Sequence, residues 1–368
     1  MDELDVLIEM SRLFGSDPEY LLAGGGNTSL KKDDSLYVKA SGTALSDITE
    51  SGFVVMDLVS LEKIWDKDYP EESRAREAEI LSDMMASRRP GETARPSVEA
   101  LLHSLIRGKY VIHTHPALIN GMTCGRDGET AAKELFGDDA LWVPLVEPGY
   151  ILAREIRGRL SAHQDRTGTY PGMIFLQNHG LFVAGNSREE ILEIHNRIRE
   201  KIASRVNRKP MENHGPVDTV LLQEVREAAG KCLGQPQYVK GVTGTDLAAC
   251  AVDDRAFEPL RLPFNPDQIV YAGPGPMRLD SLSDFSDALA LYRDRWNRPP
   301  GSFLLKDVGA FGLGETEKKA EAALLLLLDS VKIAVYAESF GGALPMTEEL
   351  IIFIRDWEVE SYRAKVSQ

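Results

Sequence analysis

Residues 171–187 read Pro-Gly-Met-Ile-Phe-Leu-Gln-Asn-His-Gly-Leu-Phe-Val-Ala-Gly-Asn-Ser. Two short apolar runs, 173–176 and 181–184, flank the turn residues Asn-His-Gly at 178–180. This pattern predicts two strands joined by a tight turn. Ser187 precedes a long amphipathic stretch that reaches about Val206, which predicts a helix capped by that serine. The segment therefore predicts a strand–turn–strand–helix unit of an α/β fold.

The same pattern recurs without gaps at residues 300–316, Pro-Gly-Ser-Phe-Leu-Leu-Lys-Asp-Val-Gly-Ala-Phe-Gly-Leu-Gly-Glu-Thr. Six of the 17 aligned positions are identical, where typical composition gives about one match. A looser match aligns 110–116 with 268–274 and thereby pairs His113 with Tyr271. We interpret the pattern as an internal duplication whose second copy keeps the structural residues and loses the histidines. The alternative is that similar units share glycines by chance.

The rest of the chain predicts a mixed α/β protein of two domains. We expect a glycine-rich turn at 24–29 and a helix that starts at Ser97. The polar segment 209–216 holds two prolines and a glycine, so it is the best linker and predicts domains at 1–210 and 217–368. Helical periodicity marks 2–14, 61–66, 74–87 and 98–106, and short strand patterns mark 35–39, 53–56 and 110–112.

Composition excludes several classes of protein. The 368 residues include 42 basic and 57 acidic side chains, for a net charge of −15. That charge argues against nucleic acid or an anionic membrane as the partner, although a local site can still bind an anionic small molecule. The three cysteines are scattered, which fits a reducing cytoplasm. The acidic N-terminus does not resemble a secretory signal, and the longest apolar run, 322–328, is far shorter than the ~20 residues of a membrane span.

Histidines supply the strongest chemical signal. His113-Thr114-His115 follows a short apolar run, and residues two apart on a strand point to the same side. With His179 in the turn at 178–180, they could hold zinc by three nitrogens and leave a position open. Glu99, at a helix start before this strand, could act as acid or base beside the metal. The alternatives are exposed histidines without a metal and a glutamate that only favours its helix dipole.

Other polar residues are less specific. Segment 24–29, Ser41-Gly42 and Ser97 supply backbone N–H groups and hydroxyls that could bind a phosphate, although each is also an ordinary tight turn or helix start. Residues 309–314 do not have the order of a dinucleotide-binding fingerprint. We expect His103 to be a packed or capping residue. We expect His163, His195 and His214 to lie in exposed polar segments, without a function.

Five motifs occur in order within about residues 1–210, and together they carry a resemblance: Gly26-Asn27-Thr28-Ser29, Lys39-Ala40-Ser41-Gly42, Pro96-Ser97-Val98-Glu99, His113-Thr114-His115-Pro116 and Asn178-His179-Gly180. The chain resembles the class II aldolase/adducin family, and within it the zinc-dependent aldolases of the fuculose- and rhamnulose-phosphate type. The second half, which includes Trp-Glu-Val-Glu-Ser-Tyr-Arg at 357–363, resembles the segment after the aldolase motifs in bifunctional rhamnulose-phosphate aldolase/dehydrogenases.

The resemblance implies an α/β/α sandwich around a mainly antiparallel sheet, followed by a degenerate copy without metal ligands. It implies zinc, or another divalent metal, on His113, His115 and His179, with Glu99 as the acid/base. In the family the phosphate pocket corresponds to Asn27, Thr28, Ser41, Gly42 and Ser97. Two features depart from the fuculose type: Val98 replaces a second serine, and the catalytic tyrosine of a neighbouring subunit has no clear counterpart.

The implied reaction is cleavage of a ketose 1-phosphate to dihydroxyacetone phosphate and an aldehyde. The family also contains sugar-acid phosphate decarboxylases, pentulose-phosphate 4-epimerases, a thioribulose-phosphate dehydratase and metal-free scaffold proteins, which remain the alternatives. Because family members form oligomers with active sites between subunits, we expect a homo-oligomer, either a dimer or a tetramer. The second copy could then replace a neighbouring subunit.

Overall fold

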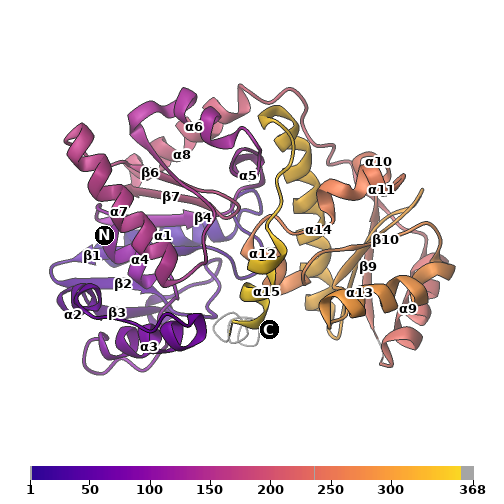
Figure 1. The fold of residues 1–368 in the computed structure, drawn as a ribbon, viewed down its shortest axis with the longest axis horizontal. Helices are drawn as coiled ribbons and strands as arrows, with labels where there is room; N and C mark the ends of the chain where they lie inside the picture. The colour runs from indigo at the N-terminus through magenta and orange to yellow at the C-terminus, as the bar shows by residue number, and fades with distance from the viewer. Residues whose placement is uncertain (1, 236, 358–368) are drawn as a thin grey trace. The chain divides into compact units, whose positions relative to one another are not determined.

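The computed structural model describes residues 2–235 and 237–357, and it divides into two compact units (Figure 1). The second unit comprises Asn120–Gly128 and Arg205–Asp356, and the first holds the other described residues. Among the described residues, no helix combines the length and the apolar character that a membrane crossing requires. The motif at 357–363 lies outside the described residues except for Trp357.

The first unit is built on a seven-stranded sheet of order β3-β2-β1-β4-β7-β6-β5. All neighbouring strands are antiparallel except β5 and β6, which confirms the expected mainly antiparallel sheet. The strands are β1 (Asn27–Lys32), β2 (Ser35–Lys39), β3 (Phe53–Asp57), β4 (Tyr110–Thr114), β5 (Ala140–Val143), β6 (Met173–Leu176) and β7 (Gly180–Gly185).

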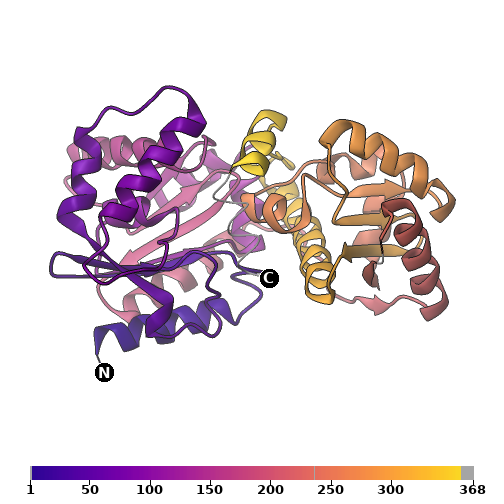
Figure 2. The ribbon, with the colours of Figure 1, turned by 90° about the horizontal axis from the view of Figure 1, so that it is seen from below.

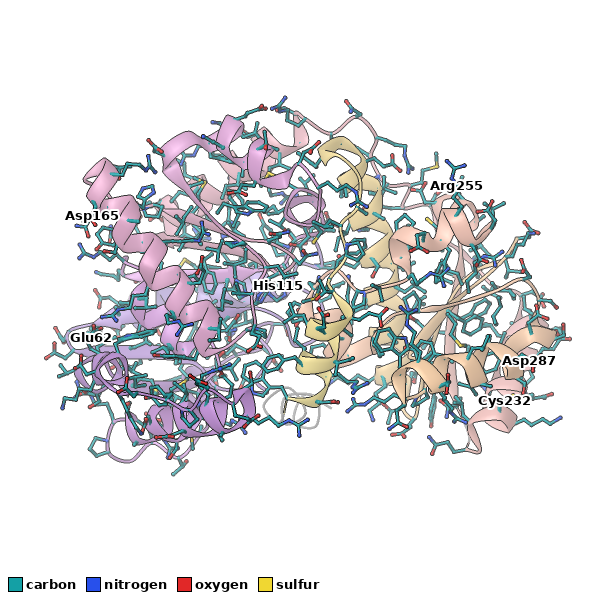
Figure 3. All side chains as sticks on the ribbon, viewed as in Figure 1. Glu62, His115, Asp165, Cys232, Arg255 and Asp287 are labelled. Carbon is teal, nitrogen blue, oxygen red and sulfur yellow. The ribbon has the colours of Figure 1, made fainter. Side chains whose placement is uncertain are left out.

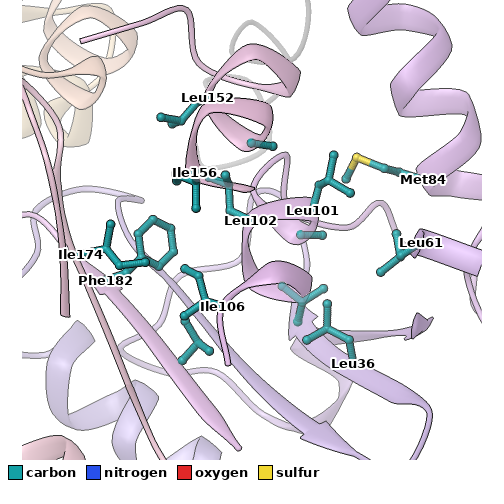
Figure 4. Packing of buried hydrophobic residues seen from close by; sticks show 14 of the residues in the cluster. Leu36, Leu61, Met84, Leu101, Leu102, Ile106, Leu152, Ile156, Ile174 and Phe182 are labelled. Carbon is teal, nitrogen blue, oxygen red and sulfur yellow. The ribbon is translucent and has the colours of Figure 1, made fainter. Parts of the chain in front are cut away.

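Helices lie on both sides of this sheet (Figure 2), so the first unit is the expected α/β/α sandwich. On one side, Leu101 and Leu102 of α4 and Ile156 of α7 belong to a buried apolar cluster that also holds Ile174 and Phe182 of the sheet (Figure 4). Burial of each large apolar side chain contributes about 1.5–3 kcal/mol. The helices are α1 (Glu3–Gly15), α2 (Leu58–Glu62), α3 (Ser73–Ala86), α4 (Ala100–Leu105), α5 (Ala117–Thr123, shared between the units), α6 (Gly128–Phe136), α7 (Tyr150–Thr167) and α8 (Arg188–Ala203).

Two local predictions need correction. Asn27, Thr28 and Ser29 are not part of a turn, because their backbones pair with β4 and open strand β1. The helix after Ser97 starts later than expected: Glu99 is the N-cap residue and α4 begins at Ala100. The cap at Ser187 is confirmed, since its side chain accepts a hydrogen bond from the Glu190 N–H.

The second unit has a five-stranded sheet of order β10-β11-β12-β9-β8. Helix α14 packs so closely on β12 that a Cβ atom at Gly312 would come within 2.1 Å of the Ala320 carbonyl oxygen. The elements are β8 (Gly215–Pro216), α9 (Thr219–Leu233), β9 (Tyr238–Thr243), α10 (Thr245–Ala251), α11 (Asp254–Phe257), α12 (Pro266–Ala272), β10 (Met277–Leu279), α13 (Phe285–Trp296), β11 (Ser302–Leu305), β12 (Gly309–Gly314), α14 (Glu317–Ala337) and α15 (Glu348–Asp356). Short 3-10 helices lie at Glu50–Gly52, Lys63–Asp66, Gly137–Asp139, Glu258–Leu260, Leu282–Asp284 and Glu338–Phe340.

The two sheets share a topology. Strands β10, β11, β12, β9 and β8 repeat the order and the directions of β5, β6, β7, β4 and β1. In the gapless alignment, Asn178 and Asp307 coincide, and both have positive φ, at 54° and 59°. The helix caps Ser187 and Thr316 also coincide. This agreement supports the duplication that we infer from the sequence.

The looser upstream match is wrong. Residues 266–272 form helix α12, which starts with a proline and is capped by Asn265, so they cannot correspond to strand β4. The neighbour of β12 is β9, and Gly241 faces Phe311 there as His113 faces Phe182 in the first sheet. Gly241 is therefore the counterpart of His113. A Cβ atom at position 241 would lie 2.8 Å from the Phe311 ring.

Candidate metal centre

Three histidines converge at the ends of strands β4 and β7. His113 Nε2 lies 2.9 Å from His115 Nε2 and 3.3 Å from His179 Nε2. Among the described residues, these three form the group with the geometry to hold a metal ion, with all ligand atoms within 4.8 Å of one another. His113 and His115 are buried, and His115 is labelled in Figure 3. The structure thus brings together the three histidines that the sequence singled out.

Backbone contacts set the orientation of His113. Its Nδ1 lies 3.0 Å from the Leu181 carbonyl oxygen, which can only accept a hydrogen bond, so Nδ1 carries the proton. The neutral ring then presents the bare lone pair of Nε2 to the other two histidines. The Phe182 ring stacks on the imidazole with centroids 4.0 Å apart.

The turn between β6 and β7 positions His179 beside His113. Asn178 adopts a left-handed backbone, with φ of 54°, and is buried, which reverses the chain between the two strands. Gly180 then passes very close to β4: a Cβ atom there would lie 2.4 Å from the Thr114 carbonyl oxygen and 2.6 Å from His115 Cδ2. Only glycine fits, so the Asn-His-Gly order has a structural cause.

Glu99 lies beside the histidines. Its Oε1 is 3.4 Å from His113 Nε2 and 3.3 Å from His179 Nε2, and its side chain is 12% exposed. The other carboxylate oxygen accepts a hydrogen bond from the Asn27 amide. Burial raises the pKa of Glu99, but the neighbouring His113, His179 and His115 outweigh this effect and hold the pKa well below its usual value. The carboxylate is therefore ionised near neutral pH.

This set of side chains fits a divalent metal. An imidazole lone pair from His113 points toward two further imidazoles, and a carboxylate oxygen lies within 3.4 Å. Such a concentration of nitrogen donors next to a carboxylate is unfavourable without a cation between them, and three histidines with one open position are typical of catalytic zinc. We therefore expect a metal on His113, His115 and His179.

The residues expected near a phosphate lie on two adjacent segments. The Ser41 N–H donates to the Arg95 carbonyl, and the Ser97 N–H donates to the Lys39 carbonyl, so Ser41-Gly42 and Ser97 lie side by side. The Ser97 hydroxyl accepts a hydrogen bond from the Glu99 backbone N–H at 3.2 Å, so this pair of segments adjoins the backbone of Glu99.

Thr28 was expected to bind the phosphate, but its side chain lies away from these two segments. Alternation along β1 places Thr28 on the opposite side of the sheet from Asn27. There, Thr28 Oγ1 is buried and lies 2.7 Å from Ser11 Oγ of α1.

The remaining histidines show one further correction. His163 and His195 are buried rather than exposed, because their apolar neighbours on α7 and α8 turn those helix faces inward. His103 is fully buried, as expected, and its Nδ1 lies 2.7 Å from Ser29 Oγ. This pair was not predicted from the sequence. The signal was present, since Ser29 follows Asn27 by two residues on a strand and His103 follows Glu99 by one helical turn.

Comparison with known proteins identifies a family that matches this chain. The family model described as "Class II Aldolase and Adducin N-terminal domain" matches residues 5–206. A protein of Bacillus subtilis (strain 168), "Uncharacterized oxidoreductase YuxG", is 30% identical over 197 residues, which make up 50% of this chain and 27% of that protein. The matched region thus spans about a quarter of the length of this relative.

Solved structures also resemble the chain. The N-terminal class II aldolase domain of a conserved protein from Thermoplasma acidophilum has a TM-score of 0.46 and 27% identity, and covers 55% of this chain and 93% of its own. An L-fuculose-1-phosphate aldolase from Thermus thermophilus has a TM-score of 0.36 and 12% identity, with coverage of 55% and 91%.

Proposed function

This chain belongs to the class II aldolase and adducin family, and we propose that it is a metal-dependent sugar-phosphate aldolase. The substrate is a ketose 1-phosphate, and the products are dihydroxyacetone phosphate and an aldehyde. The observation that carries the proposal is the contact of the Glu99 carboxylate with His113 and His179, at 3.4 and 3.3 Å. An ionised carboxylate next to a three-histidine site is suited to proton transfer at a carbon beside a carbonyl group.

We assign the metal, zinc in the first instance, to His113, His115 and His179. A metal bound there supplies Lewis acidity that stabilises negative charge on the substrate oxygens. The His113 ring is held for this role by its hydrogen bond to the Leu181 carbonyl, which fixes the tautomer.

Glu99 moves the proton. In the synthetic direction, its ionised carboxylate removes a proton from the hydroxyl-bearing carbon of dihydroxyacetone phosphate. The electron pair of that C–H bond forms the new C–C bond, while the aldehyde oxygen keeps the electrons of its C=O π bond and takes a proton from solvent. In cleavage, the hydroxyl group that becomes the aldehyde loses its proton to solvent as the C–C bond breaks, and the protonated Glu99 carboxyl group delivers a proton to the same carbon. The Glu99 carboxylate is ionised near neutral pH, so the base form that the first step needs is present at rest. The Asn27 amide holds one carboxylate oxygen and leaves Oε1 on the histidine side.

The phosphate group of the substrate would bind at Ser41, Gly42 and Ser97. Asn27 would lie between this phosphate pocket and the Glu99 carboxylate that it contacts. Gly42 has φ of 82°, a backbone that a residue with a side chain rarely adopts. The Ser97 hydroxyl, two residues before Glu99, ties the phosphate side to the proton-transfer side. Thr28 has no part in this pocket, because its hydroxyl is bonded to Ser11.

The first experiment measures release of dihydroxyacetone phosphate from a panel of ketose 1-phosphates, with and without a chelator. Release that chelation abolishes and zinc restores supports the proposal. A protein that binds one metal per chain and releases nothing would instead be tested for sugar-acid phosphate decarboxylase, 4-epimerase and dehydratase activity. A protein without metal and without activity would be a scaffold. Light scattering of the same preparation tests the homo-oligomer that we expect.

A half-reaction isolates the role of Glu99. With dihydroxyacetone phosphate alone in D₂O, the wild-type protein should exchange one proton of the hydroxyl-bearing carbon for deuterium, as followed by NMR. Glu99→Gln keeps the shape of the side chain but cannot accept the proton, so we expect exchange to fall by about 10²-fold or more. Normal exchange in Glu99→Gln with the metal retained would contradict the assignment.

A further inference from the structure

Strand β1 and the segment of α4 are joined by three polar contacts in a row. The Asn27 amide donates to the Glu99 carboxylate, Ser29 Oγ lies 2.7 Å from His103 Nδ1, and Lys31 Nζ donates to the Ile106 carbonyl oxygen at 2.5 Å. The strand contributes alternate residues, and the helical segment contributes residues from successive turns. We call this set of three contacts the β1–α4 ladder.

The spacing of alternate residues along β1 matches the spacing of successive turns along α4. Alternate residues of a strand lie about 6.6 Å apart and point to the same face. Residues four apart on a helix lie on one face and about 6 Å apart along the axis. The spacing of Asn27 and Ser29 therefore agrees with that of Glu99 and His103 to within about 1 Å. Two contacts at matched spacing prevent the helix from sliding along the strand or rotating against it, whereas one contact would allow both.

Burial makes the middle contact costly to break. His103 is 0% exposed, and no hydrogen-bond partner lies at its Nε2 among the described residues. The contact between Nδ1 and Ser29 Oγ is therefore the one hydrogen bond that its ring makes within the described part of the chain. Removal of either partner leaves a buried polar atom unsatisfied. The His103 ring also makes an edge-to-face contact with Phe182, with centroids 5.4 Å apart, and Phe182 stacks on His113. His103 thus lies on the helix that Glu99 caps, and it contacts the ring that stacks on His113.

We propose that Ser29 and His103 are positioning residues that hold the Glu99 carboxylate in register with the three histidines. Neither residue touches the substrate in this proposal. It rests on the function proposed above, and it deepens that proposal by naming the residues that determine where the proton-transferring group lies.

The test compares Ser29→Ala, His103→Leu and His103→Asn. The asparagine places an amide atom at the position of Nδ1, so it can restore the bond to Ser29. We expect Ser29→Ala and His103→Leu to bind one zinc per chain, to lower kcat about 10–100-fold and to leave KM within about threefold. We expect the visible absorption spectrum of the Co²⁺-loaded protein to change as Glu99 moves near the metal. His103→Asn should recover most of both properties.

His163→Leu is the matched control, because it removes another buried histidine of the same unit, on α7. It should leave kcat and the Co²⁺ spectrum unchanged. The proposal is overturned if Ser29→Ala and His103→Leu keep the wild-type spectrum, or alter it no more than His163→Leu does. The spectrum also separates the two proposals. If the wild-type protein releases no dihydroxyacetone phosphate, the proposed aldolase activity is wrong, yet the Co²⁺ spectra still test whether Ser29 and His103 position Glu99.

Discussion

The Phe182 ring lies almost parallel to the His113 imidazole, with 4.0 Å between centroids and 14° between planes. The aromatic ring therefore limits rotation of the His113 side chain, which we assign to the metal and whose Nδ1 is already held by the Leu181 carbonyl oxygen. Phe182→Leu removes the flat surface and leaves the hydrogen bond. We expect zinc affinity to fall about 10-fold, as is typical when support of a ligand is lost, measured by competition with a chromogenic chelator. Phe175→Leu, in the adjacent strand and equally buried, should leave the affinity unchanged; equal affinities in both variants would show that the stacking has no role.

Metal should add stability to a site that the fold already forms. A ligand at about 1,000 times its Kd raises the free energy of unfolding by about 4 kcal/mol. We expect zinc to raise the Tm of the wild-type protein, and His179→Ala to lose most of this rise while the metal-free Tm stays close to that of the wild type. A zinc-dependent rise of equal size in His179→Ala would place the metal elsewhere.

Gly180→Ala should damage the metal centre through the backbone. The added Cβ atom would lie 2.4 Å from the Thr114 carbonyl oxygen and 2.6 Å from His115 Cδ2, so β7 or His115 must move. We expect a loss of more than about 2 kcal/mol in stability and a weaker metal site, measured by urea unfolding and zinc titration. Gly158→Ala is the control: it lies within α7, nothing lies within 4 Å of its Cβ position, and it should stabilise the protein by about 0.5–1 kcal/mol.

His195 should make the protein sensitive to acid. Burial, aided by the positive charge of Arg199, lowers its pKa from 6.5 to about 3, so the folded protein keeps the ring neutral while the unfolded chain takes up a proton below pH 6.5. The stability is fully present above pH 6.5 and is lost as the pH falls toward 3. At about pH 5 the loss from this group is about 2 kcal/mol. In His195→Leu, the drop in unfolding free energy between about pH 7.5 and pH 5, measured in urea, should be smaller by about that amount; an unchanged drop would contradict the assignment.

The local sequence pattern was sufficient to predict much of the secondary structure of the first unit. The strands at 35–39 and 173–176 have the predicted bounds, because each is an apolar run flanked by residues that favour turns. The histidine cluster could also be predicted from the sequence, since residues 113 and 115 are two apart and His179 lies in a recognisable turn.

The failures arise from tertiary contacts that a linear pattern does not contain. Asn27 to Ser29 have polar, turn-favouring side chains, yet they form a strand because β4 pairs with their backbone. Likewise, the polar surroundings of His195 suggested exposure, whereas Phe14 and Tyr20 from a distant part of the chain enclose its ring. The side of the sheet that Thr28 faces could be assigned only once the start of β1 was known.

Gly241, the counterpart of His113 in the second sheet, bears on the history of the chain. The Phe311 ring lies where a side chain at position 241 would begin, and it stacks instead on Phe303, with centroids 4.9 Å apart. A histidine restored at 241 would collide with that ring unless Phe311 also changed. On the duplication that we infer, the second copy cannot regain its metal ligand by a single substitution. On this inference, the loss of a histidine at 241 is effectively one-way, because the packing of Phe311 would have to change with it.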